Sequence, residues 1–60
     1  MDRLLTIREV ADLTHIPVKT LYNYRSEGTG PPSARVGRRI LYRARDVEEW
    51  LEVQFARGRP

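Results

Sequence analysis

The stretch VKTLYNYRSEGTGPP, residues 18–32, decides the fold, because it starts as a helix and ends where no helix can continue. Pro17 suits the first turn of this helix, since the backbone N–H that proline lacks has no helical partner there. The helix is predicted to run to about Glu27, and Gly28 can adopt the left-handed conformation that ends helices. The two prolines that follow exclude a helix from the next loop. The stretch therefore divides a helical first half from a second half with its own structure.

The predicted helix has two unlike faces. Leu21 lies on the inward face, with Ile16 before it and Tyr24 after it. The opposite arc is mostly polar and carries Val18, Lys19, Tyr22, Asn23 and Ser26. The composition of this arc alone is equally compatible with a solvated helix face and with a surface that meets a partner. We interpret it as a binding surface, because a stable domain does not require it.

Another helix is predicted before this one. Thr6 and Glu9 have the spacing of a capping box, in which each side chain bonds the backbone N–H of the other residue. Leu5 and Val10 are placed to form the hydrophobic staple that accompanies such a cap. The apolar spacing predicts a helix over residues 7–14, followed by a tight turn at residues 14–16.

A β-hairpin is predicted after the prolines, from residue 33 to residue 42. We expect Gly37–Arg39 to form a three-residue loop, because a two-residue loop would place Arg39 inward beside Val36. Side chains alternate along a strand. The core face is therefore predicted to carry two cross-strand pairs, Val36 with Ile40 and Ala34 with Tyr42.

The last helix is predicted to start near residues 44–46. Its apolar stripe consists of Val47, Trp50, Leu51 and Phe55. Trp50 is interpreted as a core residue that holds this helix against the first two. Residues 1–60 are thus expected to form one domain, with a core of about residues 4–55 and a frayed basic tail at residues 56–60.

Composition excludes several classes of protein. The chain has 60 residues, no cysteine and one histidine, so it has no disulfide and lacks the roughly four ligands of a structural zinc site. A nuclease would need carboxylates aimed at a metal ion, whereas the acids here follow one helical face. No apolar run approaches the roughly 20 residues of a membrane span. We therefore expect a soluble cytoplasmic protein with no catalytic residues, cofactor or metal.

The positive charge is concentrated in one part of the sequence. The net charge is only +3, yet residues 35–45 contain five arginines and no acid. The acids Asp46, Glu48, Glu49 and Glu52 follow immediately. This separation predicts a positive field on one face of the molecule and not on another.

Three segments together resemble a known family: residues 6–11 (TIREVA), 19–24 (KTLYNY) and 33–51 (SARVGRRILYRARDVEEWL). They are similar to the excisionase-type, MerR-like winged helix-turn-helix DNA-binding domains, over about residues 4–55. The resemblance implies a mainly α fold with a small β-hairpin, in the order helix-turn-helix, two-stranded wing and C-terminal helix. The chain departs from the usual residues of this family at two positions. Pro17 stands where members often carry Ser or a similar N-cap, and Tyr24 stands where they often carry Trp.

The resemblance also implies that the partner is double-stranded DNA. The second helix would enter a major groove, with recognition residues Val18, Lys19, Thr20, Tyr22 and Asn23. The wing would contact the minor groove or the backbone through Arg35, Arg38, Arg39 and Arg43. A solubilising hairpin tip is the alternative for these arginines, and Arg25 can instead pair with an acid inside the domain.

Within this family, the likeness implies an excisionase, or recombination directionality factor, of a bacteriophage. Such proteins act in the bacterial cytoplasm, bind repeated sites, bend the DNA and direct a tyrosine-type integrase toward excision. Copies are expected to associate head-to-tail on DNA, and no small-molecule effector or coiled-coil dimer is implied. The alternatives are a small transcriptional regulator, such as an AlpA-like protein or a repressor, and a module that binds an acidic protein.

Overall fold

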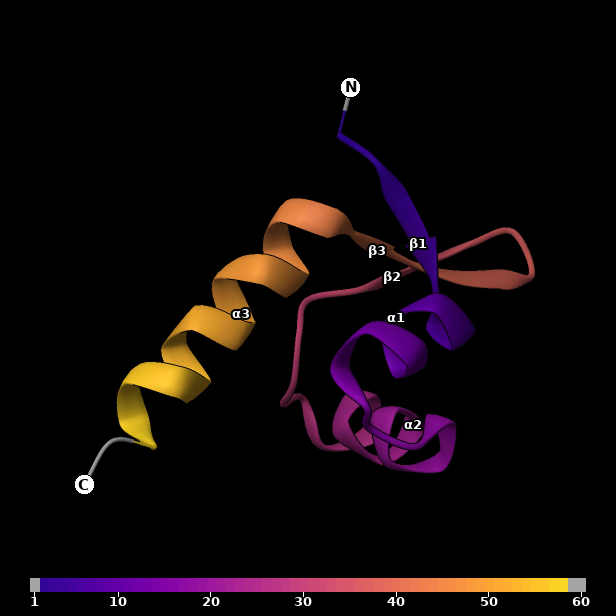
Figure 1. Ribbon diagram of the computed structural model, residues 1–60. Helices are drawn as coiled ribbons and strands as arrows, with labels where there is room; N and C mark the ends of the chain where they lie inside the picture. The colour runs from indigo at the N-terminus through magenta and orange to yellow at the C-terminus, as the bar shows by residue number, and fades with distance from the viewer. Residues whose placement is uncertain (1, 59–60) are drawn as a thin grey trace.

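Three helices and a three-stranded antiparallel sheet make up residues 2–58, the part of the chain that the computed structural model describes. Helices α1 and α2 lie together beside the sheet, and α3 leaves the end of β3 and extends away from them (Figure 1). The elements in chain order are β1 (Leu4–Thr6), α1 (Ile7–Thr14), α2 (Val18–Glu27), β2 (Ala34–Val36), β3 (Arg39–Arg43) and α3 (Ala44–Arg57). The predicted order of helices and hairpin is confirmed, and β1 is an addition to it.

The capping box at the start of α1 is present as predicted. The backbone N–H of Thr6 donates to Glu9 Oε1 at 2.8 Å, and the backbone N–H of Glu9 donates to Thr6 Oγ1 at 3.2 Å. The bond from the Thr6 backbone lowers the pKa of Glu9, because the charged carboxylate is the better acceptor. At its other end α1 stops at His15, whose φ of 61° is left-handed.

Helix α2 ends as predicted but begins one residue later. Pro17 has φ −58° and ψ 145°, which is extended, so it is the N-cap and not part of the first turn. Gly28 ends the helix with φ 74°. In the loop beyond it, Gly30 has φ 77° and lies so close to Tyr24 that an added Cβ would be 2.7 Å from Tyr24 Cδ2. The loop after α2 is therefore packed tightly onto the helix.

The sheet has an edge strand that the sequence pattern did not reveal. β1 pairs antiparallel with β3, which lies in the middle of the order β1-β3-β2, and Leu5 opposes Tyr42. Three residues are too few to show alternation, and the next residue already belongs to the capping box. Through β1, the N-terminal part of the domain is hydrogen-bonded to the β-hairpin.

The predicted hairpin register is wrong. The pairs are Ala34 with Leu41, Arg35 with Ile40 and Val36 with Arg39, so the loop has two residues, Gly37 and Arg38. Gly37 has φ 63° at the first loop position, as a type II′ turn requires. The prediction failed because it assumed that Val36 faces the core. Val36 is 58% exposed, so Arg39 beside it also points outward.

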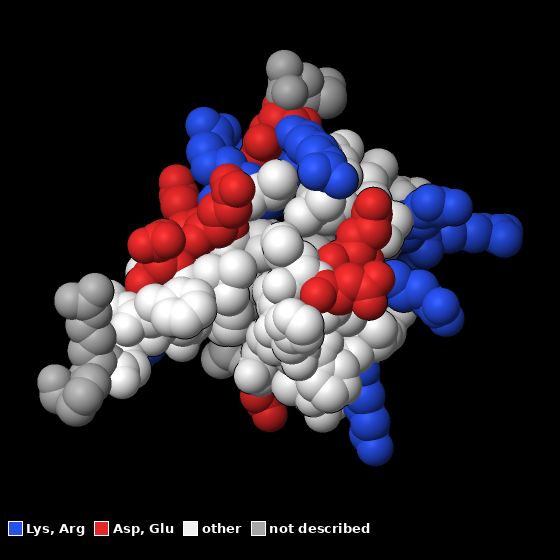
Figure 2. All heavy atoms as spheres, viewed as in Figure 1, with Lys and Arg blue, Asp and Glu red and all other residues white. Residues whose placement is uncertain are grey.

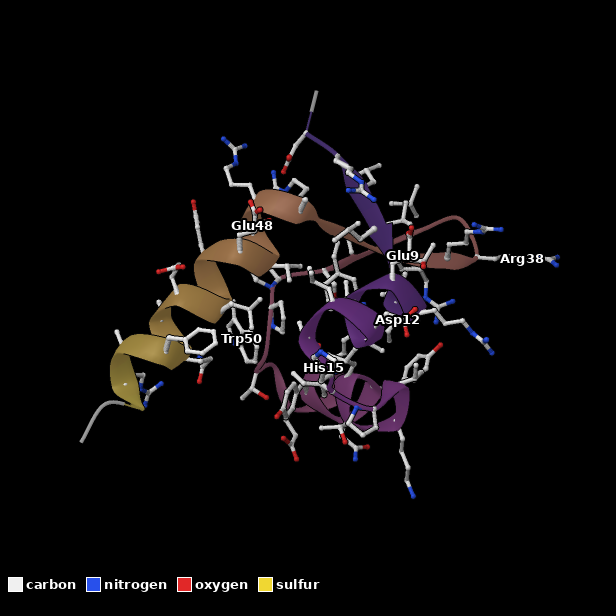
Figure 3. All side chains as sticks on the ribbon, viewed as in Figure 1. Glu9, Asp12, His15, Arg38, Glu48 and Trp50 are labelled. Atoms are coloured by element: carbon white, nitrogen blue, oxygen red, sulfur yellow. The ribbon has the colours of Figure 1, made fainter. Side chains whose placement is uncertain are left out.

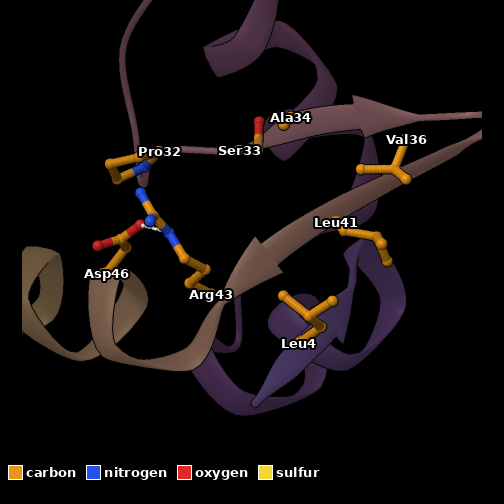
Figure 4. Close-up of a pocket in the computed structure, with 8 residues that line it drawn as sticks. All are labelled: Leu4, Pro32, Ser33, Ala34, Val36, Leu41, Arg43 and Asp46. Carbon is orange, nitrogen blue, oxygen red and sulfur yellow. Dashed lines mark hydrogen bonds and ion pairs between the residues drawn. The ribbon is translucent and has the colours of Figure 1, made fainter. Parts of the chain in front are cut away.

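The two faces of the sheet differ in environment. Leu5, Ile40 and Tyr42 face the helices and are buried. The side chains that alternate with them, including those of Leu4 and Val36, lie on the opposite face and stay accessible (Figure 4). Ala34, predicted for the core, is also exposed.

One hydrophobic core joins the helices to the sheet. It consists of Leu5, Val10, Leu21, Ile40, Tyr42 and Val47, with Ile16, Tyr24 and Leu51 among the partly buried residues packed against it. Tyr42 is the largest fully buried side chain, as expected, and burial raises its pKa. Leu5 and Val10, the predicted staple, share this core.

Helix α3 is fixed at its start and free at its end. The N-terminal segment caps it: the backbone N–H of Ala44 donates to the carbonyl oxygen of Arg3, and that of Arg45 donates to Asp2 Oδ2. The predicted stripe is only partly correct, because Phe55 is 72% exposed. Trp50 was predicted as a core residue but is only partly buried and lies outside the core cluster; the centroid of its ring is 6.2 Å from that of Tyr24 on α2.

The predicted basic tail is shorter than expected. Residues 56 and 57 still belong to α3, and the helix ends at Gly58, whose N–H donates to the carbonyl oxygen of Gln54. Residues 59 and 60 of the predicted tail lie outside the described residues.

Candidate nucleic-acid interface

The outer arc of α2 is available to a partner along its length. Lys19 and Asn23, one turn apart, are exposed, and Tyr22 is 49% exposed. Val18 and Thr20 are partly buried at the start of the helix. Within the described residues no side chain caps this helix, so the positive end of α2 is accessible beside Lys19. Side chains on the first turn of such a helix can reach into a groove.

The hairpin forms the second surface. Arg38 occupies the loop and projects from the tip (Figure 3). Arg39 begins β3, and Arg35 lies on β2 opposite Ile40. All three arginines are exposed. A two-residue loop makes this tip narrow, which suits insertion between two DNA backbones.

A shallow hollow joins the two surfaces. Tyr22 of α2 and Arg35, Arg38 and Arg39 of the hairpin line it together with Thr6, Ile7, Arg8 and Ile40. The outer arc of α2 and the wing therefore meet on one side of the molecule. Lys and Arg side chains project from the hairpin side, and acidic side chains lie over the near face of α3 and also over α1, beside the hairpin (Figure 2).

Two of the arginines considered in the sequence lie elsewhere. Arg43 is at the far end of β3 from the tip, and its Nε lies 2.8 Å from Asp46 Oδ2 in an ion pair (Figure 4). Arg25 pairs with no acid among the described residues, and its Nε donates to Ser33 Oγ at 2.7 Å. Arg43 is thus not brought together with Arg35, Arg38 and Arg39.

Arg8 is the residue of this surface that sequence reasoning missed. It lies on the exposed side of α1 and lines the hollow beside Tyr22. The sequence analysis used this helix only for its cap and its apolar face. The available signal was its basic side chain between the two capping residues, Thr6 and Glu9, but only the packing of α1 against the sheet brings it to the wing.

Residues 2–58 contain no candidate metal site. In that span no three His, Cys, Asp or Glu side chains are grouped to hold a metal ion. His15 is exposed in the turn between α1 and α2. The described helices are also too short and too polar for any of them to cross a membrane.

A helix-turn-helix followed by a β-hairpin wing and a C-terminal helix is the architecture of the winged helix-turn-helix class of proteins. A family model described as a helix-turn-helix domain matches residues 4–54. The chain belongs to this helix-turn-helix family. Comparison with curated proteins and with solved structures gives no significant match.

Membership of this family supports sequence-specific binding of double-stranded DNA. The family includes excisionase-like proteins, and its domains are typically not enzymes. The basic hollow agrees with a DNA partner, since phosphate neutralisation by Arg and Lys provides most of the affinity for DNA.

Proposed function

We propose that α2 enters a major groove while the Arg38–Arg39 wing contacts the adjacent minor groove or backbone. The observation that carries this docking is that Tyr22 of α2 and the hairpin arginines line one hollow. Because they face the same side, one duplex can touch both at once. Arginine at a narrow tip is attracted by the enhanced negative potential of a narrow minor groove.

The residues of α2 have different tasks in this proposal. Lys19 and Asn23, exposed on one strip, read base edges: a lysine suits guanine and an asparagine suits adenine. Val18 gives an apolar contact to a base. Thr20 bonds a phosphate, which fixes the register of the protein without reading sequence.

The proposed biological role is that of a phage-type excisionase, which binds repeated sites, bends the DNA and directs an integrase. The likeness of residues 6–11, 19–24 and 33–51 to such proteins supports it. Head-to-tail association of copies on DNA is also supported by charge, because the acidic side chains of α3 and the basic wing are separate surfaces. The acidic surface of α3 on one copy can therefore contact the basic wing of a neighbouring copy.

Binding to a duplex as a function of salt tests the DNA-binding proposal. Neutralised phosphates release counterions, so the logarithm of affinity should fall linearly with the logarithm of salt concentration, by about 0.9 per contact. If the chain binds no duplex but does bind an acidic protein, its function is that of the protein-interaction module instead.

The excisionase role needs a separate experiment. Footprinting on DNA from the host genetic element should show protection of repeated sites beside an attachment site, and a gel assay with permuted sites should show a bend. Adding the chain to the neighbouring integrase should then raise excision. Protection confined to a promoter, with excision unchanged, would favour a transcriptional regulator.

A further inference from the structure

The hollow beside Tyr22 contains one arginine, Arg8, that the docking proposed above does not use. Four arginines line it, Arg8, Arg35, Arg38 and Arg39, and no acid does. The net charge of the whole chain is only +3. The rest of the molecule is therefore not net positive, and the field of the protein is concentrated here.

None of these arginines forms an ion pair with an acid among residues 2–58. Among residues 2–58, the ion pair between Arg43 and Asp46 is the one present, and it lies outside the hollow. Like charges held close together repel one another in the free protein, and an anion between them removes that repulsion. A guanidinium group offers planar pairs of N–H donors that match two phosphate oxygens. The chemistry of the hollow thus fits a phosphate.

The arginines and the tyrosine of this lining come from separate parts of the fold: Arg8 from α1, Tyr22 from α2 and the remaining arginines from the hairpin. If α2 lies in a major groove and the wing in the adjacent minor groove, one sugar–phosphate backbone must pass between them. The hollow occupies that position. We infer that it holds a phosphate of this backbone, and that Arg8 and Tyr22 bind the phosphate together.

This inference rests on the proposed docking and extends it in two ways. It adds a DNA contact from α1, outside the recognition helix and the wing. It also assigns the Tyr22 hydroxyl to a phosphate, whereas the resemblance placed Tyr22 among the recognition residues. A phosphate contact carries no sequence information, so removing Arg8 should weaken binding to all duplexes by the same factor.

The test compares Arg8→Ala with Arg57→Ala, which removes the same charge from the exposed end of α3. The probe is a labelled duplex of arbitrary sequence about two helical turns long. Affinity is measured between about 50 and 200 mM salt. Arg8→Ala should weaken binding and make the salt slope shallower by about one contact, whereas Arg57→Ala should leave the slope unchanged. Because Arg8 is exposed, thermal unfolding should show an intact fold for both variants.

A second measurement locates the contact. In a duplex that carries one selected binding site, which fixes the register of the protein, methylphosphonate replaces one backbone phosphate at a time, and wild type is compared with Arg8→Ala and Tyr22→Phe. One position, or two adjacent ones, should abolish the difference between wild type and both variants.

The outcomes separate the inference from the proposal beneath it. If wild type binds the duplex but Arg8→Ala behaves like Arg57→Ala, the phosphate site is wrong and the docking of α2 and the wing stands. If Arg8→Ala changes the preference between duplexes, Arg8 reads a base and the inference is again wrong. If wild type binds no duplex, both fall.

Discussion

Single residues on the same helix arc differ in what they contribute. Asn23 and Tyr22 are neighbours in sequence, yet Tyr22 lines the arginine-rich hollow and Asn23 does not. An exposed side chain of α2 that lies outside the hollow can contact base edges in the major groove. A side chain inside the hollow is surrounded by groups that attract phosphate. Replacing Asn23 should therefore change sequence specificity, whereas replacing Tyr22 should weaken binding to all sequences alike.

Replacing Asn23 with alanine should reduce the difference in binding free energy between the best site and random DNA by about 1–3 kcal/mol, the value of a bidentate contact to a base. Competition between a selected duplex and random duplex measures this difference. Ser26→Ala, an exposed change on the same helix, is the matched control. An undiminished difference would show that Asn23 reads nothing.

Glu9 should make stability depend on pH in the acid range. Its pKa is lowered in the folded protein by the hydrogen bond from the Thr6 backbone. Its stabilising contribution is therefore complete above the unfolded value, about 4.3, and is lost as pH falls through the lowered folded value. Melting temperatures of wild type and Glu9→Gln should differ near neutral pH and converge in acid. If the two melting temperatures still differ by the same amount at pH values well below the pKa of Glu9, this explanation is wrong.

At the scale of elements, the loop after α2 and the wing each depend on one glycine, for different reasons. Gly30 has a positive φ and also leaves no space for a side chain beside Tyr24. Gly37 has a positive φ of 63°, but nothing lies within 4 Å of where a Cβ would be. The first glycine serves packing as well as backbone conformation, and the second serves conformation alone.

Gly37→Ala should therefore cost roughly 1–2 kcal/mol, the penalty of a left-handed L-residue. Gly30→Ala should cost that amount and a further 1–3 kcal/mol or so for overpacking against Tyr24. Thermal unfolding measures both, at about 4–8 °C for each kcal/mol in a domain of this size. Equal melting temperatures for the two variants would mean that the loop moves away from Tyr24 without cost.

The wing is an element whose arginines act without regard to sequence. Arg38→Ala combined with Arg39→Ala should weaken binding to every duplex and make the salt slope shallower by up to about two contacts. The matched pair is Arg45→Ala with Arg57→Ala, two exposed arginines of α3. Unchanged affinity at physiological salt would remove the wing from the interface.

At the scale of the whole molecule, the sequence was most informative where a local rule determines the structure. Thr6 with Glu9 located the start of α1, and Gly28 located the end of α2. Prediction failed where distant pairing decides the outcome. β1 pairs with β3 through Leu5 and Tyr42. The register of β2 on β3 places Arg35 opposite Ile40, so Val36 points outward and the hairpin loop has two residues.

The same limit applies to the candidate site. The outer arc of α2 follows from helical spacing, and the arginine tip follows from the glycine and the adjacent basic residues. Arg8 could not be assigned, since its neighbours in the hollow come from α2 and the hairpin. Phe55 was misplaced for a related reason: helical period predicts a stripe, but α3 extends past the elements that could cover its end.

The position of β1 has a consequence for how the chain acquires its structure. Leu5 of β1 and its partner Tyr42 of β3 are far apart in the sequence, so β1 is synthesised well before the strand with which it pairs. Helices α1 and α2 alone therefore lack the side chains that close their core. Folding during synthesis should wait for β3 and then occur in a single cooperative step, so the DNA-binding surface should arise only after the third strand has been translated.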